Sequence, residues 1–517
     1  MTERIDVIVI GAGHNGLVCA TYLARKGLNV TCLESAETAG GMAARRTLSD
    51  DYHFPGLAHI APSLDPEIAN DLALNRFGYS VGAPIQTIAL DTGGQHLTVG
   101  TDTIKGEGVS DADIAAYPAF RRQYLEFAKA LRPLFVNKPP RIKDMPFDDK
   151  ATLAKLGWNL RFSLGKASMY EFLRVAAINI YDVLNETFDD PRLKGAIAAD
   201  AVLGSAMGPR TPGTVLTWLQ KLHGEISGQL SVQAGQLTDA LTQSAENAGV
   251  NIRCGVTVSR VLIENDKAFG VALDNGDLVK AKTVISNADP RVTFLDLVGA
   301  PRLDAMFANR AAQIRGAGVV GKLNIALSGL PEFSGVDVDA MKNRLLIAPS
   351  MDYVERAFNH SKYGEYSEHP VIDVSIPSLH NPALAPDGHH VLSANVSYVP
   401  YELDDGDWGD ETSTLGYRVI SLLGQYAPNL TSLIVDHEFL TPADVEHQYG
   451  AKQGHWHHGE LSIHQSFMMR PLYGAAQYDT PVTGLFLCGA GCHPGGGLSG
   501  LPGRNAAKRI LDIGVTK

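Results

Sequence analysis

Short runs of apolar residues separated by glycine-rich turns predict a parallel β-sheet built partly from the start of this chain. Residues 5–10 read Ile-Asp-Val-Ile-Val-Ile, a pattern typical of a strand that is buried on both faces. Leu17, Ala20 and Ala24 then recur at helical spacing, and a second apolar run follows over residues 29–33. This order of strand, helix and strand predicts a βαβ unit.

Glycines occupy the turn between that first strand and the helix, at Gly11, Gly13 and Gly16. The first glycine permits a tight turn, the second leaves room for a diphosphate, and the third lets the helix pack closely on the sheet. Glu34 ends the second strand and can accept hydrogen bonds from ribose hydroxyls. The pattern therefore predicts a dinucleotide site. The same glycine spacing over residues 316–321 follows no apolar strand and precedes an alternating, strand-like run, so we interpret it as chance.

A second glycine pair, Gly40 and Gly41, is followed by Arg45 and Arg46. One interpretation is a further close approach of the backbone to the diphosphate, with an arginine that neutralises its charge. The other is a surface turn with a solvated basic pair. The spacing alone leaves both open.

The C-terminal end of the chain predicts the same order of elements: a buried strand, a glycine-rich loop and a helix. An apolar run over residues 484–488 leads into a twelve-residue stretch, 489–500, that contains six glycines. A flexible linker is the alternative, but the position between a buried strand and an amphipathic helix favours a backbone that lies flat against a planar ligand. For a flavin, the helix start would place partial positive charge where reduction adds negative charge.

The middle of the chain contains a further helix and several predicted strands. The pattern predicts a helix over residues 236–245 and strands over 250–253, 256–263, 269–273 and 279–286. A helix followed by such a meander commonly completes an FAD-binding domain.

Composition narrows the function classes. The chain has 517 residues, a formal net charge of −12 and 19% charged residues. This charge, without a basic run, argues against nucleic acid as a partner. Five scattered cysteines without a Cys-x-x-Cys pair favour a reducing compartment. We find neither a signal-peptide pattern nor an apolar run long enough to span a membrane, so we expect a cytoplasmic protein that is at most peripheral to a membrane.

Four stretches together resemble the phytoene desaturase and carotenoid oxidoreductase-like FAD enzymes, a branch of the amine oxidase superfamily. More closely, they resemble the branch named after pyridine nucleotide-disulfide oxidoreductase domain-containing protein 2. The stretches are VIVIGAGHNGLVCATYLARKGLNVTCLE, VISNADP, HHGELSIHQSFMMRPLYG and GLFLCGAGCHPGGGLSGLPGRNAA. They lie at both ends and in the middle, so the resemblance spans nearly the whole chain.

The resemblance implies an α/β fold in which a discontinuous Rossmann-like FAD-binding domain carries an inserted α+β substrate domain. The segments we expect for the FAD-binding domain are 1–75, 229–290 and 476–517, and those for the substrate domain are 76–228 and 291–475. Noncovalent FAD is the implied cofactor. The residues expected to hold it are Gly11, Gly13, Gly16, Glu34, Gly40, Gly41, Arg45, Val258, Gly489, Gly491 and Gly497.

Two further features offer candidate side chains. Cys492 lies within the glycine-rich loop and is either a small packing residue or the site of a covalent flavin link. The run from His455 to His458 suggests a metal only weakly, because it lacks a nearby cysteine and a helical spacing with an acid, so we expect no metal. His458, Glu460 and His493 are the candidates for proton handling, but we assign no catalytic side chain.

The function we expect is FAD-dependent desaturation of an apolar polyene or lipid-like substrate by hydride transfer to flavin N5. A flavin amine oxidase is one alternative, and a non-redox double-bond isomerase or a non-catalytic FAD protein is another. Without a second nucleotide fingerprint, reoxidation by oxygen or a quinone is favoured over reoxidation by NAD(P). The sequence does not determine the oligomeric state, and a helical face could contact a membrane.

Overall fold

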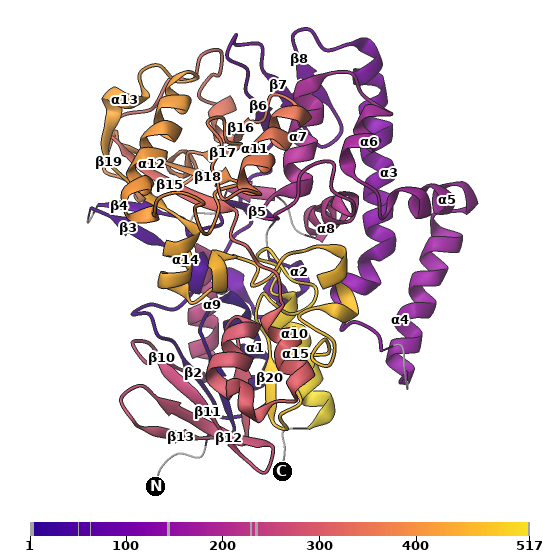
Figure 1. Ribbon diagram of the computed structural model, residues 1–517, viewed down its shortest axis with the longest axis vertical. Coiled ribbons are helices and arrows are strands. Elements are labelled where there is room, and N and C mark those ends of the chain that lie inside the picture. The colour runs from indigo at the N-terminus through magenta and orange to yellow at the C-terminus, as the bar shows by residue number, and fades with distance from the viewer. Residues whose placement is uncertain are drawn as a thin grey trace.

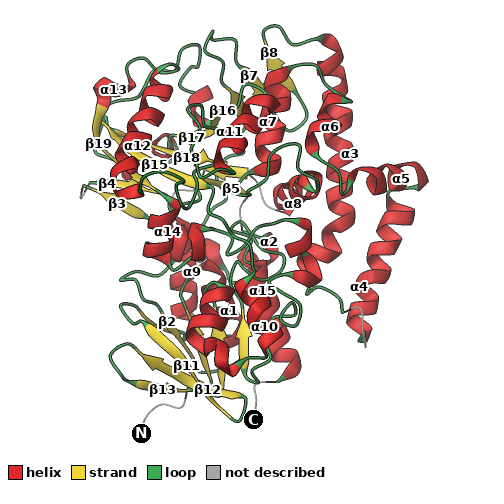
Figure 2. Cartoon of the chain, viewed as in Figure 1, coloured by secondary structure: helices red, strands yellow, loops and turns green. Residues whose placement is uncertain are grey.

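The computed structural model describes residues 5–49, 51–62, 64–141, 145–227, 230–232 and 236–514. A parallel five-stranded sheet forms one end of the molecule, and an eight-stranded sheet forms the other (Figure 1). Long helices run along one side of the eight-stranded sheet, and Figure 2 shows loops concentrated between the two sheets. The first and last described residues lie on the same side of the molecule, beside the five-stranded sheet.

The five-stranded sheet has the order β10-β2-β1-β14-β20, and every neighbouring pair is parallel. Its strands are β1 (Val7–Ile10), β2 (Val30–Leu33), β10 (Asn251–Arg253), β14 (Thr283–Ser286) and β20 (Leu485–Leu487). Side chains of a strand point alternately to the two faces. Val7 and Val9 accordingly pack with the helices α1 (His14–Ala24), α9 (Gln236–Asn247) and α15 (Leu501–Ile513).

The other face of this sheet is covered by a second, smaller sheet. Ile8 and Ile10 share a core with Val261 and Val271, which belong to the antiparallel sheet β11-β12-β13. The strands of this sheet are β11 (Val258–Glu264), β12 (Lys267–Leu273) and β13 (Leu278–Lys280). The strands of the parallel sheet are therefore buried on both faces, which explains their nearly continuous apolar sequences.

The run 279–286, predicted as one strand, is two strands in the structure. β13 pairs antiparallel with β12, whereas β14 pairs parallel with β1 and β20. Burial changes at the same point: β13 is exposed at both ends, while all four residues of β14 are buried. The prediction failed because a run of apolar residues does not reveal that consecutive parts pair in different sheets. The strand expected at 250–253 likewise extends the parallel sheet as β10 instead of joining the meander.

The eight-stranded sheet has the order β19-β15-β18-β17-β16-β6-β7-β8. Its strands are β6 (Thr87–Ala89), β7 (Leu97–Val99), β8 (Ile104–Gly106), β15 (Val320–Leu327), β16 (Arg344–Ile347), β17 (Ile372–Ser375), β18 (His390–Ser397) and β19 (Ile434–Leu440). β15 begins inside the second glycine-spaced match, over residues 316–321, so this match leads into a strand and lacks the helix that a dinucleotide site needs.

Helices cover both faces of this sheet. Leu346 on one face packs with α7 (Pro191–Val202) and α11 (Met351–Ser361), and Leu345 on the other packs with α12 (Trp408–Gly424). The lateral helices are α3 (Asp111–Val136), α4 (Phe147–Trp158), α5 (Lys166–Val175), α6 (Ile180–Asn185) and α8 (Thr214–Ser227). Within the described ranges, none of the helices has the length and hydropathy needed to cross a membrane.

Shorter elements connect the two ends. They are β3 (Arg46–Leu48), β4 (Tyr52–Phe54), β5 (Ile60–Pro62), β9 (Leu230–Val232), α2 (Pro66–Asp71), α10 (Ala305–Ala312), α13 (Leu430–Leu433) and α14 (Pro442–Tyr449). Part of the segment expected for the substrate domain packs into the core of α1 and the parallel sheet. The residues that do so are Phe294, Phe307 and Leu472. The expected boundary between residues 228 and 229 lies outside the described residues. The domain limits remain a prediction.

Candidate functional site

The first glycine turn has the close contacts that its sequence predicts. The N-cap of α1 is Gly13, which has no capping side chain, so amide groups of the first helical turn point away from the helix without an internal acceptor. A Cβ on Gly16 would lie 2.3 Å from the Gly11 carbonyl oxygen, and one on Gly41 would lie 3.2 Å from the Gly13 Cα. The backbone of the second glycine pair therefore lies directly against the first turn.

Glu34 lies at the end of β2 and is buried beside this turn. Its Oε2 accepts a hydrogen bond from the Ala12 amide at 2.7 Å, and its Oε1 accepts one from the Ala36 amide at 3.0 Å. The Val256 amide donates to the Glu34 carbonyl at 2.8 Å, so the chain lies next to Glu34 two residues before Val258, the first residue of β11. Arg45 pairs with Asp239 of α9 at 3.1 Å on a partly exposed surface, and its role in binding the cofactor remains a prediction.

The C-terminal glycine loop lies against the same turn. Asn287, at the end of β14, separates the two segments: a Cβ on Gly13 would lie 2.8 Å from its Nδ2, and one on Gly489 would lie 2.5 Å from its carbonyl oxygen. Gly503 of α15 approaches the Asn15 carbonyl so closely that a Cβ would lie 2.2 Å from the oxygen. The structure thus brings together two glycine-rich segments that are far apart in the sequence.

These features fit a dinucleotide such as FAD. The uncapped start of α1 suits a diphosphate, and Glu34 suits a ribose. Gly497 lies at the open side of the C-terminal loop with φ +66°, and a Cβ there would meet nothing within 4 Å. A planar ring could therefore lie against the loop at this point.

A cavity of about 200 Å³ lies between the C-terminal loop and the eight-stranded sheet. Gly495, Gly496 and Gly497 form its floor on the loop side. Most of its wall is apolar, with contributions from Ile60, Ala61, Phe135, Leu203, Leu461 and Leu498. The Phe135 ring contacts the rings of His223 and Phe467.

One part of the cavity wall is charged, and sequence reasoning missed it. Arg344 on β16 bonds Asp200 on α7 at 2.5 Å and Asp373 on β17 at 2.8 Å. Burial alone would raise the pKa of Asp373, but Arg344 and His59 reverse this effect and lower the pKa below its usual range. The available signal was a charged residue inside an otherwise apolar strand, as in Arg344-Leu-Leu-Ile.

Lys322 on β15 lies behind this charged wall and is fully enclosed. Its Nζ lies 2.8 Å from His59 Nδ1 and donates to Asn395 Oδ1 and the Leu57 carbonyl, both at 3.2 Å. Burial lowers the pKa of Lys322 to about 7 and that of His59 to about 4. Lys322 therefore gives up its proton at a much lower pH than an exposed lysine does.

This lowered pKa predicts a pH-dependent stability. Between about pH 7 and the ordinary pKa of lysine, the unfolded chain binds more protons at this position than the folded one does. Lys322 should therefore make the free energy of unfolding rise with pH in that window, by up to about 1.4 kcal/mol per pH unit. Thermal unfolding of wild type and Lys322→Met across this pH window tests the prediction. The difference between their free energies of unfolding should change with pH. A constant difference would contradict the assignment.

The three proton-handling candidates do not line the cavity; their neighbours His457, Leu461 and Pro494 do. His493 Nε2 lies 2.6 Å from the Leu134 carbonyl oxygen, and burial lowers the pKa of His493 to about 4. Burial also lowers the pKa of His458 and raises that of Glu460. Their roles in proton handling remain a prediction.

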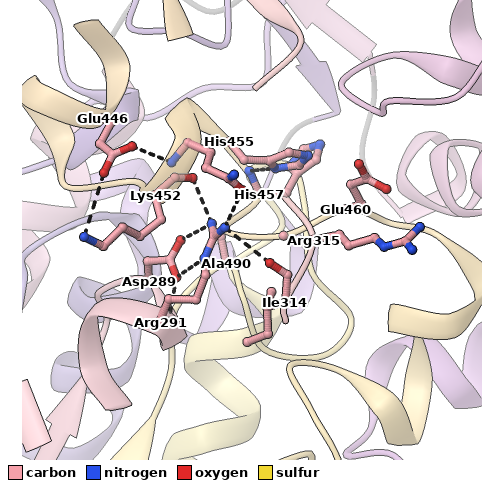
Figure 3. A network of polar contacts seen from close by, with 12 residues as sticks. Asp289, Arg291, Ile314, Arg315, Glu446, Lys452, His455, His457, Glu460 and Ala490 are labelled. Atoms are coloured by element: carbon pink, nitrogen blue, oxygen red, sulfur yellow. Dashed lines mark hydrogen bonds and ion pairs between the residues drawn. The ribbon is translucent and has the colours of Figure 1, made fainter. Parts of the chain in front are cut away.

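Two buried arginines hold the loops beneath the site. Arg291 pairs with Asp289 at 2.8 Å and also donates to the carbonyl oxygens of Lys452 and Ile314 (Figure 3). Among the described residues, Arg470 donates to carbonyl oxygens alone: those of His457, Gly459, Glu460 and Ala490 lie at 2.7–3.2 Å from its Nη atoms, and that of Gln465 lies at 3.5 Å. Burial lowers the pKa of Arg470 to about 10, so the side chain remains charged at neutral pH.

Cys492, His455 and His458 are buried. Cys492 packs in the core shared with α1, and burial raises the pKa of its thiol to about 12, which suppresses the nucleophilic thiolate. Across the described part of the chain, no three His, Cys, Asp or Glu side chains are arranged to hold a metal ion.

Comparisons with known proteins agree with this geometry. The NAD(P)-binding Rossmann-like domain family matches residues 9–73. The chain is 32% identical to pyridine nucleotide-disulfide oxidoreductase domain-containing protein 2 of Rattus norvegicus, with 99% of this chain and 94% of the relative covered. It is 26% identical to a limonene dehydrogenase polypeptide of Castellaniella defragrans (99% and 96% covered) and 24% identical to a neurosporene-forming phytoene desaturase of Cereibacter sphaeroides (96% and 92% covered).

A solved structure of putrescine oxidase bound to putrescine has a similar fold. The TM-score is 0.59 at 15% identity, and the match covers 99% of both chains. The architecture expected from the sequence, a Rossmann-like unit within an amine oxidase-like fold, is confirmed.

Proposed function

The chain belongs to the family of pyridine nucleotide-disulfide oxidoreductase domain-containing protein 2, and from that premise we propose that it is an FAD-dependent dehydrogenase of an apolar substrate. It is an oxidoreductase of the superfamily that includes flavin amine oxidases and carotenoid desaturases. The proposal adds the substrate class and the reaction: removal of hydrogen from a carbon–carbon bond of a polyene or lipid-like molecule.

The observation that carries this proposal is the mostly apolar cavity whose floor is the C-terminal glycine loop. Apolar walls favour a substrate that gains free energy by leaving water. Two relatives support the same class, since one is named as part of a limonene dehydrogenase and another as a phytoene desaturase.

The residues of this chain would bind the cofactor and position the substrate. FAD, when bound, supplies the two-electron oxidant that accepts a hydride. The free amides at the start of α1 would hold its diphosphate, Glu34 would hold a ribose, and the loop from Gly489 to Gly497 would support the ring. The apolar wall would hold the substrate C–H bond in position and exclude water. No side chain needs to act as a nucleophile, and we propose oxygen or a quinone as the final electron acceptor.

One observation favours an amine oxidase as a second candidate. Oδ1 of the buried Asp373 has no hydrogen-bond partner among the described residues, although it lies 3.6 Å from His59 in an ion-pair contact. A carboxylate at the cavity wall could accept a hydrogen bond from an ammonium group. Arg344 and Lys221 at the same wall oppose a cationic ligand.

Anaerobic reduction of the bound flavin tests the proposal. We expect a small apolar alkene such as limonene, or a polyene, to bleach the visible absorption of the holoprotein in the absence of oxygen. Bleaching only by amines, with peroxide release when oxygen is readmitted, would establish the amine oxidase instead. If compounds of neither class bleach the flavin, the protein is not a dehydrogenase of this kind.

A further inference from the structure

A second cavity, of about 570 Å³, adjoins the first at the side of α8. Asp200, Lys221 and Leu230 line both cavities, so these three residues form the wall between them. The outer cavity reaches solvent through the exposed residues Pro84 and Thr101. Its apolar lining includes Ile85, Val99, Phe120, Leu125 and Trp218.

A row of alternating charges crosses the dividing wall. From outside inward, Arg121 pairs with Glu225, Lys221 pairs with Asp200, and Asp200 pairs with Arg344. Lys221 and Glu225 also lie on one face of α8, with Nζ and Oε1 3.7 Å apart. Each of these side chains therefore has an oppositely charged neighbour on the row.

This arrangement lets the wall open without leaving an unpaired charge. When Lys221 moves away from Asp200, it can remain with Glu225, and Asp200 keeps its bond to Arg344. An unpaired buried charge is costly, so exchange between two existing partners is the cheaper way to open a path. Lys221 and Asp200 are also partly accessible, with side-chain exposures of 16% and 19%.

We propose that the two cavities form one binding channel for an elongated amphiphile, with the Lys221–Asp200 pair as its gate. The apolar chain of the ligand would pass the gate into the inner cavity, and an acidic head group would stay outside near Arg121. The lining of the outer cavity contains three cations, Arg121, Lys129 and Lys221, against two carboxylates. Nε of Arg121 has no hydrogen-bond partner within the part of the chain that the structure describes. This inference deepens the proposed function and rests on it for the identity of the ligand as substrate.

Binding of parinaric acid, a polyene fatty acid, tests the channel without turnover. Equilibrium dialysis of the oxidised holoprotein should show binding by wild type. In Ile85→Trp, a larger side chain projects into the outer cavity and narrows it, and we expect the affinity to fall by roughly tenfold. Val81→Trp is the matched control, because Val81 lies four residues away, is 50% exposed and lines neither cavity. Equal affinities for the two variants, or an absence of binding by wild type, would overturn the channel.

Two further arms test the head group and the gate. The methyl ester of parinaric acid should bind several times more weakly than the acid, and equal affinities would overturn the acidic head group. Lys221→Met should speed association by about fivefold, the factor corresponding to a weak ion pair. Stopped-flow quenching of the polyene emission by the flavin measures this rate, and an unchanged rate would overturn the gate. Since none of these readouts needs hydride transfer, failure of the bleaching experiment would leave the channel intact.

Discussion

Gly497→Ala is expected to yield a folded protein that has lost most of its flavin. The residue has φ +66°, and a Cβ would point into open space at the cavity floor, where we propose that the ring lies. The methyl group would take up space needed by the cofactor. We expect flavin affinity to fall by at least roughly tenfold, the equivalent of about 1.4 kcal/mol. The ratio of flavin absorbance to protein absorbance after purification, and a titration with added FAD, measure this loss.

Gly78→Ala separates this steric effect from backbone strain. Gly78 has φ +84°, a Cβ there would also meet nothing within 4 Å, and the residue caps a surface turn over 74–77. Both substitutions place an alanine in the left-handed region, and each should lower the free energy of unfolding by about 1–2 kcal/mol. We expect the two variants to show similar decreases in melting temperature. Gly78→Ala should nevertheless retain a normal flavin content. If Gly497→Ala retains its flavin to the same degree, the proposed ring position is wrong.

Arg470→Met is expected to cause the largest loss of stability. The guanidinium donates to five carbonyl groups, four within residues 457–465 and one of Ala490, and only 2% of the residue is exposed. Methionine fills a similar volume but donates no hydrogen bond, so buried carbonyl oxygens would lose their donor. We expect the free energy of unfolding to fall by about 3–5 kcal/mol. Denaturant unfolding followed by circular dichroism measures it.

Arg174→Met is the surface counterpart of this substitution. Arg174 bonds Glu171 and Glu186 but is 46% exposed in its side chain, so its removal should cost less than about 1 kcal/mol. Arg470→Lys keeps the charge but has fewer donors. Its free energy of unfolding should therefore lie between those of Arg470→Met and wild type. A loss below about 1 kcal/mol in Arg470→Met would show that the carbonyl groups find other partners, and that Arg470 does not hold the loop.

The first glycine turn and Glu34 could be predicted because their signals lie within one continuous βαβ unit. Each residue there acts through its immediate neighbours: Gly16 against Gly11, and Glu34 against Ala12. The same is true of the loop after β20, where a buried strand, six glycines and a helix follow one another. Local patterns of this kind translate directly into backbone geometry.

The charged row and Asp373, which pairs with its inner end, could not be predicted. Arg121, Asp200, Lys221, Arg344 and Asp373 come from separate helices and strands, and each alone looks like an ordinary charged residue. Which histidine faces the cavity was equally hidden: His457 lines it, whereas His458 does not. One residue along an irregular loop changes the direction of a side chain, and no periodicity marks the change.

The amino-acid sequence by itself determined the opening βαβ unit, the glycine turns and the dinucleotide type of site, because these follow from short-range patterns of apolar residues and glycine. Only the tertiary structure decided where the cavity lies, which charges face it and which loop carbonyl groups Arg470 binds. Those features arise where distant segments meet, and burial there changes the pKa of a group and its hydrogen-bonding needs in ways that depend on all its neighbours.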